Sequence, residues 1–158
     1  MRFRSKVMLD FTKIIFISKT DTGRGPLACE IMKKMLGSDA GIESRGLVVL
    51  FPEPMNPKIV AIAASKGINL EDRVSVQLTE EDFDSKTLVL TMDEKYKTVI
   101  YDDYTNAVNV YTCKEFVGDD GDMENPYGGE LMDYGRVYEN LEELTKKVIE
   151  KLREEDDE

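Results

Sequence analysis

Apolar residues fall into two alternating patterns along the chain: short continuous runs, and longer stretches in which they recur every three or four positions. The short runs, together with the segment GIESRG, predict strands at residues 13–17, 41–46, 87–91 and 108–111. The longer stretches and their start signals, such as Pro26 and Asp93, predict helices at residues 26–36, 56–66, 94–101 and 131–152. The first and last of these helices carry a clear apolar stripe on one face.

Strands that alternate with helices predict a parallel sheet that is covered on both faces. We therefore expect a single-domain α/β protein at residues 13–153, with a four-stranded parallel sheet flanked by helices in three layers. Residues 1–12 are expected to form an N-terminal extension, and residues 154–158 a solvated, frayed acidic tail. Ligands of such sheets bind beyond the carboxyl ends of the strands, so the loop after residue 18 is the first candidate site.

Composition narrows the classes of function. The 158-residue chain is 41% hydrophobic, which is typical of a folded domain. Its formal net charge of −11 argues against binding to nucleic acid or to anionic membrane surfaces. No apolar run approaches the roughly 18 residues that a membrane span requires. We expect a cytoplasmic protein that binds neither nucleic acid nor membrane.

The chain has no histidine and two cysteines, Cys29 and Cys113. This excludes catalytic pairs that need histidine and leaves no cluster of metal ligands. We expect no metal and no cofactor. Cys29, one turn into the first helix, is expected to fill space in the core rather than to act as a nucleophile, and Cys113 is expected to be core or neutral.

A polar loop follows the first strand and leads into a helix that begins near Pro26. Successive N–H groups of such a loop can surround an anion, and the helix dipole strengthens the field there. The guanidinium of Arg24 can bind two phosphate oxygens at once. We therefore expect a phosphate-binding loop with Ser18 at its mouth, formed by Lys19, Thr20, Asp21, Thr22, Gly23, Arg24 and Gly25.

The stretch SKTDTGRGP at residues 18–26 resembles the signature of low-molecular-weight protein phosphatases, Cys-x5-Arg-Ser/Thr-Pro after a strand. Further segments match in order and spacing over nearly the whole chain: GIESRG, GINLEDRVSVQLTEEDF, TLVLTMDEKYK, VYTCKEFVGD and ENPYGGELMDYGRVYENLEEL. The resemblance implies a low-molecular-weight phosphatase-like fold and hydrolysis of phosphomonoesters through a phosphocysteine, with an aspartate as general acid. It leans toward the bacterial protein arginine phosphatase branch, because Thr22 occupies a loop position associated with phosphoarginine in place of phosphotyrosine.

The chain departs from the family pattern where the chemistry takes place. Ser18 stands in place of the nucleophilic cysteine, Asn125 in place of the general acid, and Gly25 in place of the Ser or Thr after the arginine. Asp21 and Thr20 replace residues that are usually Asn and Gly. A serine hydroxyl needs a neighbouring base, and loss of a general acid costs roughly 10²–10⁴ in rate. We therefore expect little or no phosphatase activity.

Each of these residues also has a structural interpretation. Asp21 could serve as a base for Ser18, or could simply tolerate a left-handed backbone conformation as asparagine does, with a charge that weakens anion binding. Ser18 is expected to make a local hydrogen bond, and Arg24 could be tied to a carboxylate such as Asp21. Asn125 could start a turn, and Tyr127 could line the pocket wall or contact the closing helix.

Three functions stay open from the sequence. The first is a pseudophosphatase that still binds phosphate or a phosphorylated protein side chain. The second is an active tyrosine or arginine phosphatase, or one inactivated by an engineered cysteine-to-serine change, although one such change leaves Gly25 and Asn125 unexplained. The third is a protein-interaction domain without a phosphate ligand. The sequence favours the first, because three positions of the expected chemistry are changed together.

Overall fold

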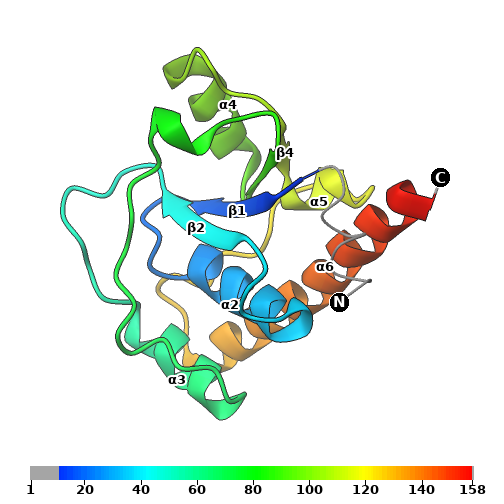
Figure 1. Ribbon diagram of the computed structural model, residues 1–158. Helices are drawn as coiled ribbons and strands as arrows, with labels where there is room; N and C mark the ends of the chain where they lie inside the picture. Colours follow the sequence, from blue (N-terminus) through cyan, green and yellow to red (C-terminus); the bar gives the residue numbers. More distant parts are fainter. Residues whose placement is uncertain (1–10, 158) are drawn as a thin grey trace.

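The computed structural model describes residues 11–157, with side chains described as far as Arg153, and shows a parallel sheet between helices (Figure 1). The sheet has the strand order β2-β1-β3-β4 and consists of β1 (Lys13–Ser18), β2 (Ile42–Gly46), β3 (Thr87–Thr91) and β4 (Val110–Thr112). All three neighbouring pairs of strands are parallel. The predicted α/β fold with a four-stranded parallel sheet is confirmed.

Helices connect the strands, as crossovers between parallel strands require. The connecting helices are α2 (Arg24–Leu36), α3 (Pro57–Ser65), the short 3-10 helix η1 (Glu80–Asp82) and α4 (Glu94–Asp103), whereas α5 (Cys113–Phe116) and α6 (Leu131–Asp157) follow β4. In Figure 1, α4 lies on one side of the sheet, and α2, α3 and α6 lie on the other. Within residues 11–157, no helix combines the length and the apolar character that a bilayer crossing requires.

Strand β1 is buried on both faces, because its side chains alternate between two apolar clusters. Ile14 and Phe16 contact the larger cluster, which contains the apolar faces of α2, α3 and α6. Ile15 and Ile17 contact the smaller cluster on the side of α4. The loop that follows Ser18 therefore starts from a strand that is held firmly on both sides.

Helix α6 is longer than the sequence pattern predicts. Its apolar stripe ends at Leu152, but the backbone continues as a helix to Asp157. Elongation adds one hydrogen bond per residue, and Arg and Glu favour helices, so the backbone can stay helical beyond the last apolar residue. The expected frayed tail is thus helical over residues 154–157. The domain boundary at residue 153 stays a prediction, and residues 1–10 of the expected N-terminal extension lie outside the described residues.

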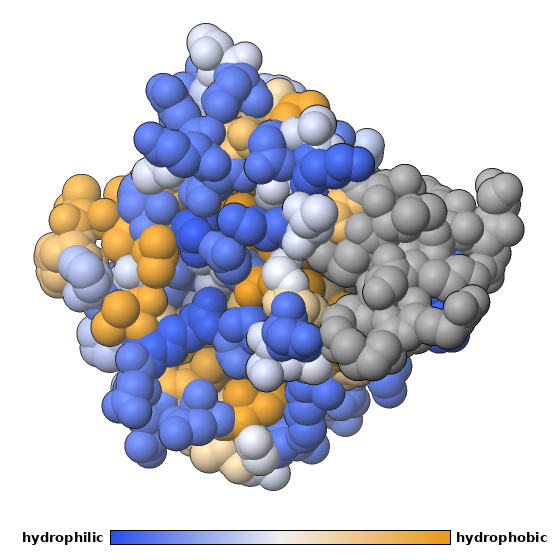
Figure 2. Space-filling model, in the orientation of Figure 1, coloured by the Kyte–Doolittle hydropathy of each residue, from blue (hydrophilic) through white to orange (hydrophobic). Residues whose placement is uncertain are grey.

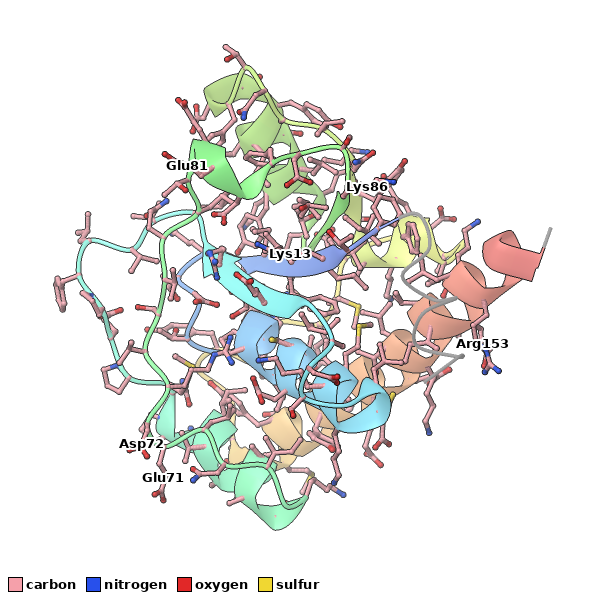
Figure 3. The ribbon with its side chains drawn as sticks, in the orientation of Figure 1. Lys13, Glu71, Asp72, Glu81, Lys86 and Arg153 are labelled. Atoms are coloured by element: carbon pink, nitrogen blue, oxygen red, sulfur yellow. The ribbon has the colours of Figure 1, made fainter. Side chains whose placement is uncertain are left out.

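The carboxyl ends of the central strands meet at one edge of the sheet. There the parallel register sets Ser18 beside Gly46 and Ile17 beside Thr91. The opposite edge is marked by Lys13 at the start of β1 and Lys86 just before β3, both labelled in Figure 3. The candidate site must therefore be sought at the Ser18 edge.

Candidate anion-binding site

The loop at residues 19–23 joins β1 to α2 and directs several carbonyl groups into the protein. These carbonyls accept hydrogen bonds from the segment after β2 and from the start of α3: Ser18 O from Leu47 N (3.1 Å), Lys19 O from Val48 N (2.9 Å) and Thr22 O from Asn56 N (2.9 Å). In a planar trans peptide the N–H points opposite to the carbonyl, so the N–H groups that follow these carbonyls face away from those partners. Among the residues that the structure describes, the N–H groups of residues 19–25 donate to no protein group. Such a run of unpaired donors at a helix N-terminus is what an anion-binding loop requires.

The loop lies directly against the end of β2, where only glycine fits. A Cβ at Gly46 would lie 2.9 Å from the carbonyl carbon of Thr20 and 3.0 Å from the nitrogen of Asp21. Both atoms belong to the backbone and cannot rotate away, so a larger residue would displace the loop. The GIESRG segment thus contributes to the site because its last residue, Gly46, lets the backbone of the loop pack directly against β2.

Asp21, in the middle of the loop, anchors the loop through its buried side chain. It has φ of 58°, the left-handed conformation that the sequence interpretation allowed, and its side chain is fully buried. Its Oδ2 accepts from Val76 N (2.9 Å), whereas Oδ1 has no partner among residues 11–157. Burial raises the pKa of the Asp21 carboxyl, although the nearby Ser44 hydroxyl, the hydrogen bond from Val76 N and the charge of Arg73 oppose this shift.

Arg24, the first residue of α2, is buried and held by two acceptors. Its Nη1 donates to Asp93 Oδ1 (3.0 Å) and to the Met123 carbonyl (2.9 Å), and its Nη2 donates to Asp93 Oδ2 (3.3 Å). The Nε–H and the second N–H of Nη2 form the other fork of the guanidinium, and this fork has no partner in the described part of the chain. The carboxylate that holds Arg24 is therefore Asp93 and not Asp21, and one fork is left for a ligand.

Asp93 occupies the predicted N-cap position of α4, but its side chain makes no capping hydrogen bond. The N–H of Glu94 donates instead to Asp122 Oδ1 (2.8 Å). The carboxylate of Asp93 faces Arg24, since a bidentate charge-assisted pair is stronger than a single capping bond. Asp93 thus marks the start of α4, as the sequence predicts, but the side chain that caps the first turn is that of Asp122.

Ser18 is 5% exposed, and its Oγ has no hydrogen-bond partner within residues 11–157. The expectation of a local hydrogen bond is therefore wrong. The position nearest to this hydroxyl is Gly25, where an added Cβ would lie only 2.9 Å from Ser18 Oγ. Because glycine has no side chain, it offers no group that could form a hydrogen bond with Ser18. The carboxylate of Asp21 makes no hydrogen bond to Ser18 either, so it is not placed as the base for this residue.

A pocket of about 490 Å³ lies at the loop, and both Ser18 and Arg24 line it. Its charged lining residues are Lys19, Arg24 and Lys95, and no carboxylate lines it within the described part of the chain. The other lining residues come from the loop, from α3, α4 and α6, and from the segment before α6: Thr20, Thr22, Gly23, Asn56, Ile59, Tyr96, Asn125, Pro126, Tyr127 and Tyr134. Because Asp93 offsets the charge of Arg24, the excess positive charge at the pocket comes from Lys19 and Lys95, and in a chain of net charge −11 it favours an anionic ligand.

Asn125 and Tyr127 lie on the pocket wall opposite the loop. The Asn125 Oδ1 accepts from the N–H of Tyr127 (3.1 Å), so the predicted turn forms, and the same asparagine lines the pocket. Tyr127 is 86% exposed and lines the rim, so the alternative in which it is packed against the closing helix is wrong. An amide cannot supply the proton that an aspartic acid would supply at this place.

Both cysteines lie in the core, away from the pocket. Burial raises the pKa of the Cys29 thiol to about 11 and that of the Cys113 thiol to about 12. Neither is a thiolate at neutral pH, and neither lines the pocket. The expectation that Cys29 is a core residue is confirmed, and Cys113 is one as well.

Sequence reasoning missed several residues of this site. Asp93 follows the carboxyl end of β3. Because ligands of parallel sheets bind beyond the carboxyl ends of the strands, this position could have been predicted to lie at the site. Lys95 and Tyr96 follow it in the first turn of α4 and line the pocket. Nothing in the local pattern indicates Asn56 or Tyr134, which come from helices far apart in the sequence and contact each other across the pocket (Asn56 Nδ2 to Tyr134 Oη, 3.4 Å).

Apolar surface borders the site on one side. The connection between β2 and α3 carries the exposed Val48, Leu50 and Phe51, and the facing segment carries Val74 and Val76. Figure 2 shows apolar side chains at the left edge, where Figure 1 draws this connection. Its hydrogen bonds to the loop carbonyls make the connection a direct neighbour of residues 19–23.

Comparison with known proteins places these features in a family. Residues 13–158 match the family model described as low molecular weight phosphotyrosine protein phosphatase. The chain is 32% identical over 136 residues to the low molecular weight protein-tyrosine-phosphatase PtpB of Staphylococcus haemolyticus, covering 86% of this chain and 96% of that protein. It is 32% identical over 145 residues to a protein-arginine-phosphatase of Bacillus subtilis, covering 89% and 96%.

A solved structure has the same fold. It is a cysteine-to-serine mutant of the YwlE arginine phosphatase with a phosphorylated active-site serine, and it superimposes with a TM-score of 0.81 at 32% identity, covering 89% of this chain and 95% of that one. The family match spans almost the whole chain and agrees with the loop, the pocket and the sheet order described above. The chain therefore belongs to the low molecular weight phosphotyrosine protein phosphatase family.

Proposed function

We propose that the pocket binds the phosphoryl group of a phosphorylated protein side chain, and that the chain turns such substrates over very slowly or not at all. The observation that carries this proposal is the combination of unpaired amides at residues 19–25 with the free fork of Arg24, in a pocket without a carboxylate. The donors favour a tetrahedral oxyanion, whereas the missing acid and base disfavour its hydrolysis.

Binding is supported because the donors are already in place. Asp93 and the Met123 carbonyl fix the guanidinium of Arg24, so little side-chain entropy is lost when a ligand arrives. Lys19 and Lys95 add positive charge at the pocket mouth. Arg24 is buried, so its charge acts more strongly than it would at an open surface.

Loss of turnover is supported by three features of the pocket. Ser18 is a far weaker acid than a cysteine thiol and has no base beside it. Asn125 cannot protonate a leaving group. Among the described residues no carboxylate or histidine lines the pocket that could act as a base, and burial raises the pKa of the Tyr96 hydroxyl.

A protein ligand is supported by the surroundings and by the relatives. The apolar surface at Val48, Leu50 and Phe51 adjoins the loop. In a protein ligand, apolar side chains that flank the phosphorylated residue would contact this surface. Relatives are named as tyrosine and arginine phosphatases of proteins. The solved relative with a phosphorylated active-site serine indicates that this fold can hold a phosphoryl group on a serine. Whether Thr22 selects phosphoarginine stays a prediction.

Thermal unfolding with inorganic phosphate, vanadate and sulfate tests the proposal. A ligand at about 100 times its dissociation constant should add roughly 2.7 kcal/mol to the free energy of unfolding. Arg24→Lys, which keeps a charge for Asp93 but lacks the fork, should lose most of this gain. Turnover of an aryl phosphate by the natural chain would contradict the claim of inactivity, and the absence of any shift with all three anions would favour the interaction domain.

Asp21→Asn should strengthen anion binding. The buried carboxylate lies directly beneath the loop, so its negative charge opposes a dianion, and its removal should tighten sulfate binding by about tenfold at neutral pH. Because burial raises the pKa of Asp21, the folded chain holds this proton more tightly than the unfolded chain does. This group therefore costs stability as the pH rises above its unfolded pKa, and the substitution should remove that cost.

Sulfate titrations from mildly acidic to neutral pH measure this effect, because the charge of sulfate does not change in that range. The natural chain should bind more tightly as the pH falls, and Asp21→Asn should lack this dependence. Asp72→Asn, a change at an exposed carboxylate after α3 (Figure 3), is the matched control. An unchanged pH dependence in Asp21→Asn would show that another group controls binding.

A further inference from the structure

Asn125 carries a free side-chain donor on the outer wall of the pocket. Its Oδ1 accepts from Tyr127 N (3.1 Å), and a backbone N–H can bond only to the oxygen of an amide side chain, so this contact fixes the orientation of the amide. No residue in the described part of the chain accepts from Asn125 Nδ2. The wall therefore offers an N–H donor at the position where the family pattern has a carboxylate.

Two lysine ammonium groups lie at the same pocket. Lys95 belongs to the first turn of α4, and its Nζ lies 5.6 Å from the centre of the Tyr96 ring, which also lines the pocket. Lys19 directly follows Ser18 and lines the pocket as well. Neither lysine forms an ion pair with a carboxylate within residues 11–157. Both charges are thus available to a group that a ligand brings.

The pocket has a buried inner end and an exposed outer end. Ser18 and Arg24, at the inner end, are 5% and 6% exposed, whereas Lys19, Lys95 and Asn125 are exposed. The loop amides and the free fork of Arg24 can hold a phosphoryl group at the inner end. The pocket volume of about 490 Å³ is in the range of about 300–1,000 Å³ that is typical of sites for whole small molecules. One ligand can therefore occupy both ends at once.

We infer that the outer end binds a second anionic group of the same ligand, the carboxylate of a glutamate or aspartate next to the phosphorylated residue. This inference rests on the proposed function, since the phosphoryl group must occupy the inner end. Ammonium groups and an amide N–H are donors, and no carboxylate of the described residues lines the pocket to compete for them. The ligand is therefore a protein segment in which an acidic residue adjoins the phosphorylated one.

The donors of the outer end suit a carboxylate better than a second phosphoryl group. Strong sites for phosphoryl groups use guanidinium forks or runs of backbone amides. Arg24 is the only arginine that lines the pocket within the described part of the chain, and its fork is at the inner end. A carboxylate has a single charge and two acceptor oxygens, which the ammonium group of Lys95 and the amide of Asn125 can bind.

The charge of the whole chain makes such a preference diagnostic of the pocket. With a formal net charge of −11, the chain as a whole repels an acidic peptide. A preference for acidic neighbours must therefore come from positive charges close to the bound peptide. Salt screens distant charges more than close pairs, so the preference should persist at physiological ionic strength.

Calorimetric titration of the full chain with three peptides tests this inference. A phosphotyrosine peptide with glutamate on both sides should bind about fivefold more tightly than the same peptide with glutamine on both sides, which is the effect of about one exposed ion pair. The glutamate peptide without the phosphoryl group should show no measurable binding, because the inner end would stay empty.

Single substitutions at exposed positions assign the effect to the outer end. Lys95→Gln should reduce the preference to less than about twofold. Asn125→Asp keeps an acceptor for Tyr127 N but replaces the free donor by a negative charge, so it should reverse the preference. Lys86→Gln, a change at an exposed lysine at the opposite edge of the sheet (Figure 3), is the matched control and should keep the full preference.

Titration with inorganic phosphate in the same buffer separates the two proposals. If the chain binds phosphate but has no preference for the glutamate phosphopeptide, the inference is overturned and the proposed phosphate binding stands. If neither phosphate nor a phosphopeptide binds, both fail. A preference that Lys95→Gln leaves intact, or that Lys86→Gln also removes, overturns the assignment to the outer end. Equal binding of the glutamate peptide without its phosphoryl group would overturn it too.

Discussion

The double variant Ser18→Cys/Asn125→Asp is expected to hydrolyse phosphotyrosine or phosphoarginine with repeated turnover. A cysteine thiol has an ordinary pKa near 8.5, and the unpaired amides at the N-terminus of α2 should lower it until thiolate dominates at neutral pH. Gly25 leaves room for the larger sulfur atom. The aspartate would restore a general acid on the opposite wall, which is worth roughly 10²–10⁴ in rate.

Steady-state kinetics of both single variants and the double variant measure this gain. Ser18→Cys alone should form a phosphocysteine but turn over slowly, and Asn125→Asp alone should stay inactive because the nucleophile is still missing. Addition of Arg24→Lys to the double variant should abolish the activity. An inactive double variant that folds and still binds phosphate would mean that the pocket no longer places its groups for hydrolysis.

Asp93→Ala is expected to be the most destabilising single substitution at this site. The pair of Arg24 and Asp93 is buried, with side-chain exposures of 6% and 8%. Removal of one partner leaves an uncompensated buried charge, which typically costs about 3–5 kcal/mol. The loss should also free the guanidinium to turn away from the loop, so anion binding should fall together with stability.

Urea unfolding of the natural chain and of Asp93→Ala gives the difference in the free energy of unfolding. Asp102→Ala, a change at an exposed carboxylate in the same helix, is the control and should stay within about 0.5 kcal/mol of the natural chain. If both substitutions have the same small effect, the buried pair does not position Arg24, and the account of the free fork has to be abandoned.

The strands and helices were largely predictable because their signals are local. The run of apolar residues at 87–91 predicted β3 at its observed bounds, and Asn56 before Pro57 marked the start of α3, where its side chain accepts from the N–H of Lys58 (2.8 Å). The end of α6 was missed, because the backbone there continues beyond the last apolar residue.

The candidate site was predicted only in part. The loop, Ser18, Arg24 and Asn125 follow from the motif and its spacing, and the structure brings them to one pocket, except that the loop residues Asp21 and Gly25 do not line it. Asp21, within the same loop, was considered as one alternative carboxylate for Arg24, whereas the structure pairs Arg24 with Asp93, which lies 69 positions further along the chain. A sequence pattern over short spacings points to a partner nearby in the chain. It carries no information that the ends of β1 and β3 lie side by side.

The sequence by itself determined the alternation of strands and helices, the candidate anion-binding loop and the three positions that depart from the family pattern, because each depends on residue types at short spacings. Only the tertiary structure decided which groups surround the loop. It left the Ser18 hydroxyl unpaired, turned the Asp21 carboxylate into the core and kept carboxylates out of the pocket. Those outcomes depend on contacts between segments far apart in the chain, which form only when the helices are packed on both faces of the sheet.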